Sequence, residues 1–352
     1  MDFDFNEQEQ AIADLTAQIL RDRVTHERLR NLNSSGEHLD RDVWGLLADA
    51  GVVGAALPEA HGGSGLDYLA VTAAIEQVGR SAALVPFLET VVMAGLPIAR
   101  FGSPAQQATL LPRIVSGDLI ASAALVVGPG VTAADSRLRG SAPVVPAGLE
   151  ADILLVPTED GFHLVETGAE GVVRTSRQTT TGHPQAMIDF DDAHSERLGH
   201  AATDDVLDWT RLRVDAAICS MIAGACRAAL DLAAEYAKVR HQFDRAIATF
   251  QAVSQRAGDA YIDTEAVQLT SRQAAWRVSA GRPAAEQVAI ARWWASEAGF
   301  RVMHAATHLH GGVGVDRDYP LHRYFLMARQ LELTLGNSEE QLERLGDLIA
   351  GR

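Results

Sequence analysis

ATHLHGGVG (residues 306–314), YPLHR (319–323) and LGNSEE (335–340) are the three parts of the stretch that decides the fold. Their order predicts a long helix, a Gly-rich break with a Tyr-Pro turn, and another helix. Gly311 and Gly312 stand together in the break, and a backbone without side chains can approach a neighbouring group closely. The stretch therefore predicts a helical C-terminal region with a special backbone break.

Helical periodicity extends on both sides of this stretch. It begins near residue 204 and covers roughly 204–239, 250–280, 284–310 and 321–350. Three long helices and a shorter terminal one predict a four-helix bundle.

The segment before the bundle has a different pattern. Between residues 119 and 200, short β-type runs are separated by clusters of Gly, Pro, Asp and Thr, which is typical of a small antiparallel sheet without a periodic helix. These runs cover residues 121–127, 153–156, 162–165 and 186–190.

The N-terminal region is again helical. Asn6 and Glu9 form a capping-box pattern, further helices are expected at 44–50, 67–80 and 87–100, and residues 51–57 read as an apolar strand-like segment. The sequence therefore predicts an α+β protein with three domains. These are an N-terminal α-helical domain (1–118), a middle β-domain (119–200) and a C-terminal α-helical bundle (201–352).

Composition excludes some classes of partner. The 352 residues include 30 basic and 46 acidic side chains, a net charge of −16, which argues against nucleic acid or an anionic membrane as partner. We see no signal peptide, and the longest apolar run, 216–226, is too short to span a bilayer, so we expect a cytoplasmic protein. Cys219 and Cys226 should lie about 10 Å apart on one helix, beyond disulfide reach, and we expect core thiols.

In this order of elements the chain resembles the acyl-CoA dehydrogenase family, flavoproteins that oxidise acyl-CoA thioesters to 2-enoyl-CoA. The resemblance rests on residues 306–340, on GVVGAALPEAHGGSG (51–65) with its Pro-Glu and double Gly, and on FGSPAQQ (101–107) and LPRIVSGD (111–118). It covers essentially the whole chain. It implies the same succession of helical domain, β-domain and helical bundle.

The resemblance implies an FAD site that is completed across a subunit interface. Arg240, Phe243 and Gln251 match the family motif that reaches the neighbouring subunit's FAD. His308 stands where the family usually has a Gln that contacts the flavin nucleotide, and Gly311 and Gly312 follow it. These six residues are the candidate cofactor-binding residues. The alternative is that Arg240 and Gln251 only solvate a turn between helices. Asp244 replaces a family Gly and places an acid near this anion site.

The chemistry of desaturation also requires a base that removes the α-proton. Leu335 occupies the position of the family's catalytic Glu, and Thr210 occupies the position used by a second subset of the family. Neither can act as a base, so we assign no catalytic residue. Arg211, beside the second position, is the candidate substrate-binding residue. The segments that would cradle the flavin ring are reduced to LVVGPGV (125–131) and APVVP (142–146).

Other polar residues have simpler interpretations. Asp208, Asp316 and Asp318 are expected to be helix caps or turn residues. His304 and His308 are one helical turn apart and could chelate a metal, but no third ligand of suitable spacing accompanies them. We therefore assign no metal.

The losses are unequal. The scaffold and the cross-interface FAD residues persist, whereas the base and the ring cradle are gone. The resemblance therefore implies the non-catalytic subunit of a heteromeric (α2β2) acyl-CoA dehydrogenase, whose homologous partner supplies the Glu and the cradle. Such split enzymes occur in bacterial steroid catabolism, which implies a steroid-derived acyl-CoA substrate and an electron-transfer flavoprotein or similar acceptor. Two alternatives stay open: a self-sufficient homo-oligomeric flavoenzyme with an unrecognised carboxylate base, and a flavin-free scaffold or binding protein.

Overall fold

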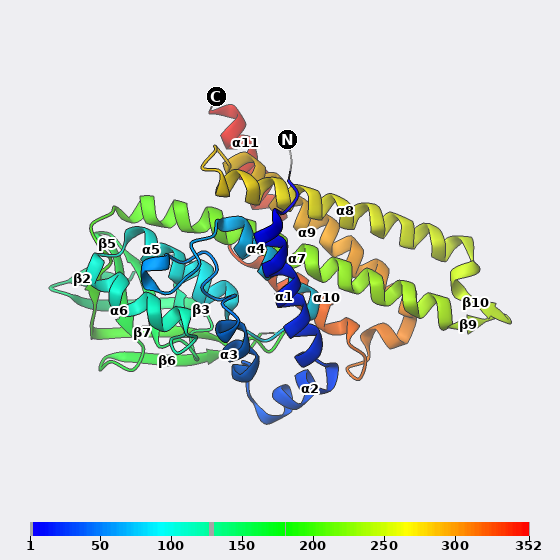
Figure 1. Cartoon of the computed structure of the whole chain (residues 1–352), viewed down its shortest axis with the longest axis horizontal. Helices are drawn as coiled ribbons and strands as arrows, with labels where there is room; N and C mark the ends of the chain where they lie inside the picture. The colour runs from blue at the N-terminus through cyan, green and yellow to red at the C-terminus, as the bar shows by residue number, and fades with distance from the viewer. Residues whose placement is uncertain (1–2, 127–129, 180, 352) are drawn as a thin grey trace.

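The computed structural model describes residues 3–126, 130–179 and 181–351. Helices from both ends of the chain pack together, and the strands of the middle segment lie at one end of the molecule (Figure 1). The opposite end is formed by the tips of the long C-terminal helices. The helix-rich fold with a small sheet region between two helical regions confirms the predicted fold class.

The N-terminal region is helical from the predicted start. Asn6 accepts hydrogen bonds from the amides of Gln8 and Glu9, and the Glu9 side chain returns to the Asn6 amide, which confirms the capping box. The second helix was not predicted, because residues 26–35 are mostly polar. The helices are α1 (Glu7–Arg23), α2 (His26–Ser35), α3 (Arg41–Asp49), α4 (Tyr68–Ser81), the π-helix η2 (Leu88–Gly95), α5 (Leu96–Phe101) and α6 (Pro104–Val115).

The expected strand-like segment at 51–57 is wrong. These residues form consecutive turns, in which the Leu57 amide donates to the Gly54 carbonyl at 3.0 Å. A Cβ atom on Gly63 would lie 2.1 Å from the Leu57 carbonyl oxygen. The chain therefore folds back tightly on itself here, and the double Gly serves that close approach.

The middle segment forms two four-stranded sheets, in the orders β1-β4-β5-β8 and β2-β3-β7-β6. The expectation of purely antiparallel pairing is wrong for β1 and β4, which run parallel with Ala121 opposite Ile153. The chain leaves β1, builds part of the other sheet and returns as β4, and such a crossover makes strands parallel. The strands are β1 (Ala121–Ala123), β2 (Thr132–Ala134), β3 (Arg137–Pro146), β4 (Ile153–Thr158), β5 (Gly161–Glu166), β6 (Val172–Arg177), β7 (Gln185–His194) and β8 (Glu196–Arg197).

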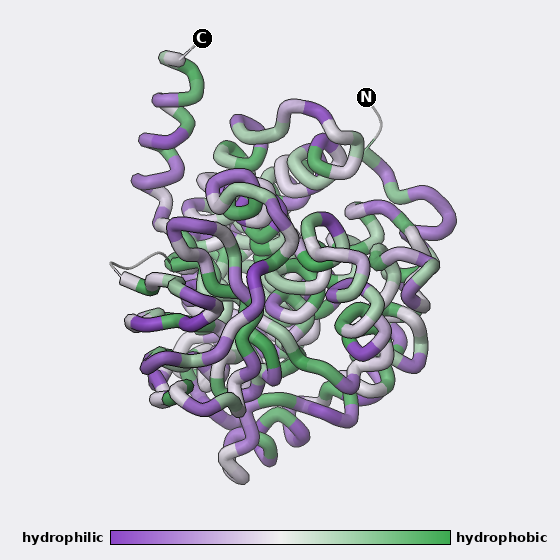
Figure 2. The backbone as a smooth tube through the Cα atoms, turned by 90° about the vertical axis from the view of Figure 1, so that its left-hand side faces the viewer, coloured by the Kyte–Doolittle hydropathy of each residue, from purple (hydrophilic) through white to green (hydrophobic). Residues whose placement is uncertain are grey.

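The C-terminal region is built from long helices, as predicted, with one difference. The expected helix over 321–350 is two helices, because Leu335 and Gly336 adopt φ values of +61° and +115° and interrupt it. The last helix stands out from the body of the chain (Figure 2). The elements are α7 (Thr203–Val239), the hairpin β9 (His241–Gln242) and β10 (Arg245–Ala246), α8 (Gln251–Ser279), α9 (Ala285–His310), the 3-10 turn η4 (Gly311–Val315), α10 (Leu321–Leu333) and α11 (Ser338–Ala350).

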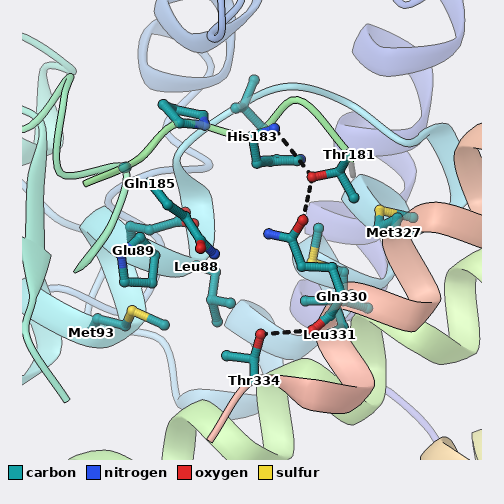
Figure 3. Close-up of a pocket in the computed structure, with 15 residues that line it drawn as sticks. Leu88, Glu89, Met93, Thr181, His183, Gln185, Met327, Gln330, Leu331 and Thr334 are labelled. Atoms are coloured by element: carbon teal, nitrogen blue, oxygen red, sulfur yellow. Dashed lines mark hydrogen bonds between the residues drawn. The ribbon is translucent and has the colours of Figure 1, made fainter. Parts of the chain in front are cut away.

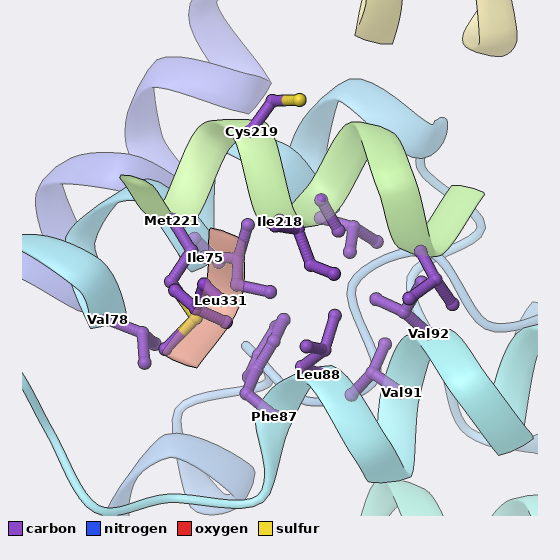
Figure 4. Packing of buried hydrophobic residues seen from close by; sticks show 14 of the residues in the cluster. Ile75, Val78, Phe87, Leu88, Val91, Val92, Ile218, Cys219, Met221 and Leu331 are labelled. Carbon is purple, nitrogen blue, oxygen red and sulfur yellow. The ribbon is translucent and has the colours of Figure 1, made fainter. Parts of the chain in front are cut away.

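One apolar core joins the N-terminal helices to the bundle. Figure 4 shows Phe87 of the segment before η2 facing Ile218 of α7 and Ile75 of α4. A Cβ on Gly79 would lie 2.0 Å from the Met221 carbonyl oxygen, so α4 and α7 approach with their backbones nearly in contact. The two helical regions therefore form a continuous scaffold, which fixes the pockets between them.

The long helix α7 lies inside this core. It is long and apolar enough to cross a membrane, but 83% of its most apolar window is buried within the chain. Cys219 and Cys226 are buried free thiols, as predicted, and burial raises the pKa of each to about 12.

Candidate functional site

The loop that carries Leu335 is built by a buried guanidinium. Arg292 of α9, fully buried, donates to the carbonyl oxygens of Leu331 (3.2 Å), Thr334 (2.6 Å) and Gly336 (3.0 Å). Its Nε lies 3.2 Å from a carboxylate oxygen of buried Asp215. These contacts satisfy backbone carbonyls that the break between α10 and α11 leaves without helical partners. The loop is therefore held firmly, but the side chain that it presents has no acid or base.

A pocket of about 450 Å³ lies in front of Leu335. Apolar side chains from α10 and from the sheet region dominate its wall, including Leu125, Val126 and Val144, which belong to the reduced cradle segments. Residues 127–129 of the first cradle segment lie outside the described residues. A flavin ring needs hydrogen bonds along its polar edge, which the apolar side chains of the cradle segments cannot provide; the polar lining residues come from other segments. The other lining residues are Met93, Ala123, Pro146, Thr179, Gln185, Arg329, Gln330, Leu333 and Thr334.

A smaller cavity of about 40 Å³, whose lining is shown in Figure 3, adjoins this pocket. It shares Met93, Gln185 and Gln330 with the outer pocket. Glu89 of η2 lines it, and burial raises the pKa of this carboxyl group to about 7. Among the described residues that line the two pockets, Glu89 is the only carboxylic acid. The inner end of the site therefore holds a titratable group that the sequence analysis missed.

A hydrogen-bonded pair closes the side of the small cavity. The Thr181 hydroxyl donates to the Gln330 side-chain oxygen, and the amide of His183 donates to Thr181 at 3.1 Å. Burial lowers the pKa of His183 to about 4, so this ring is neutral at pH 7. The polar groups of the cavity wall are thus neutral or protonatable, which suits an uncharged rather than an ionic occupant.

Thr210 occupies the second position at which the family places a base, and it cannot act as a base either. Thr210 is fully buried in α7, and its hydroxyl has no hydrogen-bond partner among the described residues. Neighbouring Arg211 donates to the Leu125 carbonyl oxygen at 2.9 Å and lines neither pocket. Its predicted role in substrate binding stays a prediction.

The start of α11 is unfavourable for an anion. Asn337 caps the helix by accepting from the amides of Glu339 and Glu340, and the Glu340 carboxylate accepts from the Asn337 amide at 2.7 Å. The free amides that attract anions at a helix N-terminus are therefore occupied by the chain itself. Two carboxylates in the first turn add repulsion.

The predicted FAD residues Arg240, Phe243 and Gln251 share the exposed connection between α7 and α8, here called the arm (residues 240–251). Arg240 ends α7, and its carbonyl accepts from the Ile247 amide at 2.8 Å. Phe243 and Asp244 form the hairpin tip with φ values of +52° and +60°. The Phe243 side chain is 86% exposed. The arm thus displays its side chains away from the chain's own core.

The helix that follows the arm begins without a cap. Gln251 is its first residue, and no side chain hydrogen-bonds to the N-terminal amides of this 29-residue helix. Arg245 packs its guanidinium over the Phe250 ring at 4.1 Å. An uncapped N-terminus beside exposed arginines attracts anions, and Asp244 is the one acid at the hairpin tip that opposes them.

His308, Gly311 and Gly312 lie together at the end of α9. Gly311 adopts φ +61° and ψ −138°, a conformation that is essentially restricted to glycine. A Cβ on Gly311 or Gly312 would meet nothing within 4 Å, so open space lies beside this backbone. The His308 carbonyl accepts a hydrogen bond from the Gly311 amide, and the His308 side chain is exposed.

A cluster of three rings connects this turn to the arm. His310 stacks on Tyr236 of α7 with ring centres 4.6 Å apart. Its Nδ1–H donates to the Ala306 carbonyl at 2.8 Å, and its Nε2 then accepts from the Tyr319 hydroxyl at 3.1 Å. The Tyr236 carbonyl accepts from the Arg240 amide at 2.9 Å. His310 and Tyr236 therefore bring the two predicted FAD segments to one end of the bundle, and the sequence analysis did not identify them.

The remaining polar candidates lie at the surface or in packing contacts. Asp208 and Asp316 are exposed, and Asp318 forms an ion pair with Arg30 at 2.9 Å. His304 packs against Phe300 and Phe325. Across residues 3–126, 130–179 and 181–351, no group of three potential metal ligands comes together.

Comparison with known proteins matches both helical regions of the chain. Residues 6–118 match the family model described as "Acyl-CoA dehydrogenase, N-terminal domain", and residues 199–349 match "Acyl-CoA dehydrogenase, C-terminal domain". "Acyl-CoA dehydrogenase FadE27" of Mycobacterium tuberculosis is 39% identical over 369 residues, which cover 99% of each protein.

Solved structures agree over the whole length. A chain of the ChsE4-ChsE5 complex from Mycobacterium tuberculosis gives a TM-score of 0.95 at 40% identity, with 100% of both chains covered. A chain of the Tcur3481-Tcur3483 steroid ACAD gives 0.91 at 37% identity, with 98% of both covered. The fold is also that of a glutaryl-CoA dehydrogenase from Mycobacterium smegmatis solved with FADH2, at TM-score 0.90 and 19% identity over 99% and 96% of the chains.

Proposed function

The chain belongs to the acyl-CoA dehydrogenase family, and from that premise we propose that it is the non-catalytic subunit of a heteromeric, FAD-dependent acyl-CoA dehydrogenase. A homologous partner supplies the Glu base and the cradle for the flavin ring. This chain supplies Arg240, Phe243, Gln251, His308 and the Gly311–Gly312 backbone across the interface. The reaction is the α,β-desaturation of an acyl-CoA thioester.

The proposal rests mainly on the contrast between the preserved loop at position 335 and the inert side chain that it presents. Arg292 maintains the loop on which the family presents its base, yet the loop presents Leu335, which cannot remove a proton. The pocket in front of it offers a flavin ring mainly apolar side chains. A chain with this site cannot catalyse the reaction alone by the family's mechanism.

The arm and the turn at Gly311 fit the nucleotide part of FAD. Bound FAD supplies the hydride acceptor of the reaction. Arg240 and the uncapped N-terminus of α8 provide positive charge for a pyrophosphate, and the Gly311–Gly312 turn leaves open space beside its backbone. No described side chain caps the N-terminus of α8, so no side chain competes with the nucleotide for its first amides.

Exposed apolar side chains around the arm support a partner chain. Val239, Phe243 and Val315 are 71%, 86% and 69% exposed. Large apolar side chains that gather on one surface mark interaction sites. The similarity to a chain of the ChsE4-ChsE5 complex and to a chain of the Tcur3481-Tcur3483 steroid ACAD supports a heteromer, and the second supports a steroid-derived acyl-CoA as substrate. We further propose an α2β2 assembly that passes electrons to an electron-transfer flavoprotein or a similar acceptor.

Flavin absorbance tests the proposal. The chain is purified alone and after co-expression with its nearest genomic sibling, as the native sequence, as Arg240→Ala and as the control Arg21→Ala. Arg21 is an exposed arginine of α1, remote in sequence from the arm. We expect colour only in the complex, reduced by Arg240→Ala and unaffected by Arg21→Ala. Stoichiometric flavin in the lone chain would overturn the split site, and a colourless complex would favour the flavin-free scaffold.

A second candidate function has one observation in its favour. A self-sufficient enzyme needs a carboxylate base, and Glu89, with its raised pKa, is the acid that lines the inner cavity. Under this alternative the lone chain binds flavin and turns over, and Glu89→Gln abolishes turnover. Under the proposed function the lone chain is inactive, and Glu89→Gln in the complex leaves the partner's base in place.

A further inference from the structure

A third pocket, of about 530 Å³, lies between α2, the start of α10 and the segment around Gly182. The two helices are neighbours in Figure 1, although nearly 300 residues separate them in the sequence. Here this space is called the basic pocket. It is distinct from the arm. Of its described lining residues, it shares only Thr179 with the pocket in front of Leu335, and Thr181, His183 and Met327 with the small cavity behind that pocket.

Basic side chains dominate the charge of this pocket. Arg30, Arg317 and Arg323 line it, and Asp318 is its one carboxylate among the described residues. Burial lowers the pKa of the lining His183 and His322, so the positive charge comes mainly from the arginines. That carboxylate already pairs with Arg30 at 2.9 Å. In a chain of net charge −16, a concave surface with this excess of positive charge attracts anions locally.

The half-buried Arg323 has no charged partner among the described residues. Its Nε is buried and has no hydrogen-bond partner among the described residues, and no ion pair joins it to a carboxylate. Burial lowers the pKa of the Arg323 guanidinium, and nearby Arg30 lowers it further. Arg323 is half-buried, so its charge is partly removed from water, and without a partner this desolvation is costly to the folded state. The uncompensated charge of Arg323 lies at the pocket wall, where a bound anion can compensate it.

The neighbouring His26 repeats this pattern. Both of its ring nitrogens are buried without partners, and its ring meets His322 edge to face at 6.2 Å. Burial, Arg323 and His322 together lower the pKa of His26. Among the described residues around His26, only the backbone of Asp318 acts in the opposite direction, so an anion that compensates the charge of Arg323 would bind from the pocket side.

The shape and lining of the basic pocket define the ligand class. Its volume exceeds that of a single inorganic ion and falls in the range of small-molecule sites. Leu84, Leu326 and Met327 provide an apolar wall, and Ser34 and Thr179 provide hydroxyl groups. We propose that the basic pocket binds a small organic anion, with its phosphate or carboxylate group at Arg323 and Arg30 and its apolar body against Leu326 and Met327.

Titration calorimetry on the full-length chain, in the complex in which it purifies, tests this site. Phenyl phosphate and benzoate carry the two oxyanions on the same ring, and benzamide is the neutral control. We expect the better anion to bind at least tenfold more tightly than benzamide, and the order of the two anions identifies the headgroup. Arg323→Gln and Arg30→Gln should each weaken that anion at least tenfold, whereas Arg21→Gln should not.

The melting temperature without ligand separates a binding role from a structural one. Because Arg323 has no partner to lose, Arg323→Gln should leave the melting temperature unchanged or raise it. A lower melting temperature with unchanged anion binding would overturn the proposal. The proposal would also be overturned if benzamide bound as tightly as the anions. It would be overturned as well if the lone chain bound the anion but the complex did not. These readouts require neither flavin nor turnover, so the result is independent of the proposed function.

Discussion

The loop at Leu335 and the arm at residues 240–251 occupy the same helical bundle, but they are stabilised in opposite ways. The loop is held by Arg292, whose guanidinium contacts three backbone carbonyls and a buried carboxylate, and it presents an inert side chain. The arm keeps polar and aromatic side chains that a nucleotide can use, and Phe243 at its tip is 86% exposed.

This difference separates what the chain needs for folding from what it needs for function. The loop's interactions are internal, so they stabilise the folded chain whether or not a ligand binds. The arm's side chains have few internal contacts, so their contribution is realised only when a partner and a nucleotide are present. Substitutions in the two regions should therefore affect different measurements.

The largest effect is expected at the loop. Arg292→Met removes the fully buried one of the two cations that pair with Asp215 and removes donors from three carbonyls, so the free energy of unfolding should fall by about 3–5 kcal/mol. Arg344→Met is the matched control, because Arg344 pairs with the same Asp215 at 3.2 Å but is 38% exposed. It should cost about 1 kcal/mol or less. Urea denaturation measures both, and equal losses would show that burial of Arg292 is not what holds the loop.

The second effect is pH-dependent and concerns the inner cavity. The pKa of Glu89 is raised from 4.5 to about 7 in the folded chain, so the folded state binds the proton more tightly than the unfolded state. Stability from this group is therefore lost as pH rises from 4.5 to 7, by about 3 kcal/mol at most. Glu89→Gln should be neutral at pH 4 and stabilising above pH 7. The prediction is contradicted if the difference in the free energy of unfolding between the native chain and Glu89→Gln is the same at every pH from 4 to 8.

Periodicity predicted most of the scaffold but not where it breaks. The long bundle helices have apolar residues at helical spacing, and their bounds agree closely with the expected ranges. Leu335 itself gives no signal of the break, because leucine does not favour a positive φ, but Gly336 and the Asn337–Glu340 capping box that follows it were usable signals. Tertiary hydrogen bonds from Arg292, 43 residues earlier in the chain, impose it. Strand β6 was not predicted either. Five of its six residues are exposed and most of these are polar, so the strand shows no alternation of apolar and polar residues.

The candidate site was predictable only in part, for a similar reason. The arm and the Gly311 turn are contiguous in the sequence, so their motifs were visible. Glu89 was not identified, although a single acid within the apolar run from Val85 to Met93 was a usable signal. The partners of Tyr236 and His310 lie on different helices, and the basic pocket joins α2 to α10. Such groups become visible only when the helices are packed.

The third effect is at the arm and should leave folding unchanged. Phe243→Ala removes an aromatic side chain that the isolated chain exposes to solvent, so urea denaturation of the lone chain should show a change within about 0.5 kcal/mol. In the heteromer an aromatic anchor contributes about 1–2 kcal/mol, and the partner should dissociate roughly tenfold more readily. Analytical ultracentrifugation of the complex measures this. Unchanged dissociation would place the partner interface away from the arm.

The smallest effect concerns Asp244, beside Phe243 at the hairpin tip. Asp244 adopts φ +60°, where glycine is free of strain, and its carboxylate opposes an anion near Arg240. Asp244→Gly should stabilise the lone chain by about 0.5–1 kcal/mol and also tighten flavin binding in the complex. Asp244→Asn tolerates the same conformation and removes only the charge, so it should tighten flavin binding with little change in stability. Flavin binding unchanged in both variants would mean that the nucleotide's charge lies away from the hairpin tip, and the arm's role would then rest on partner contacts alone.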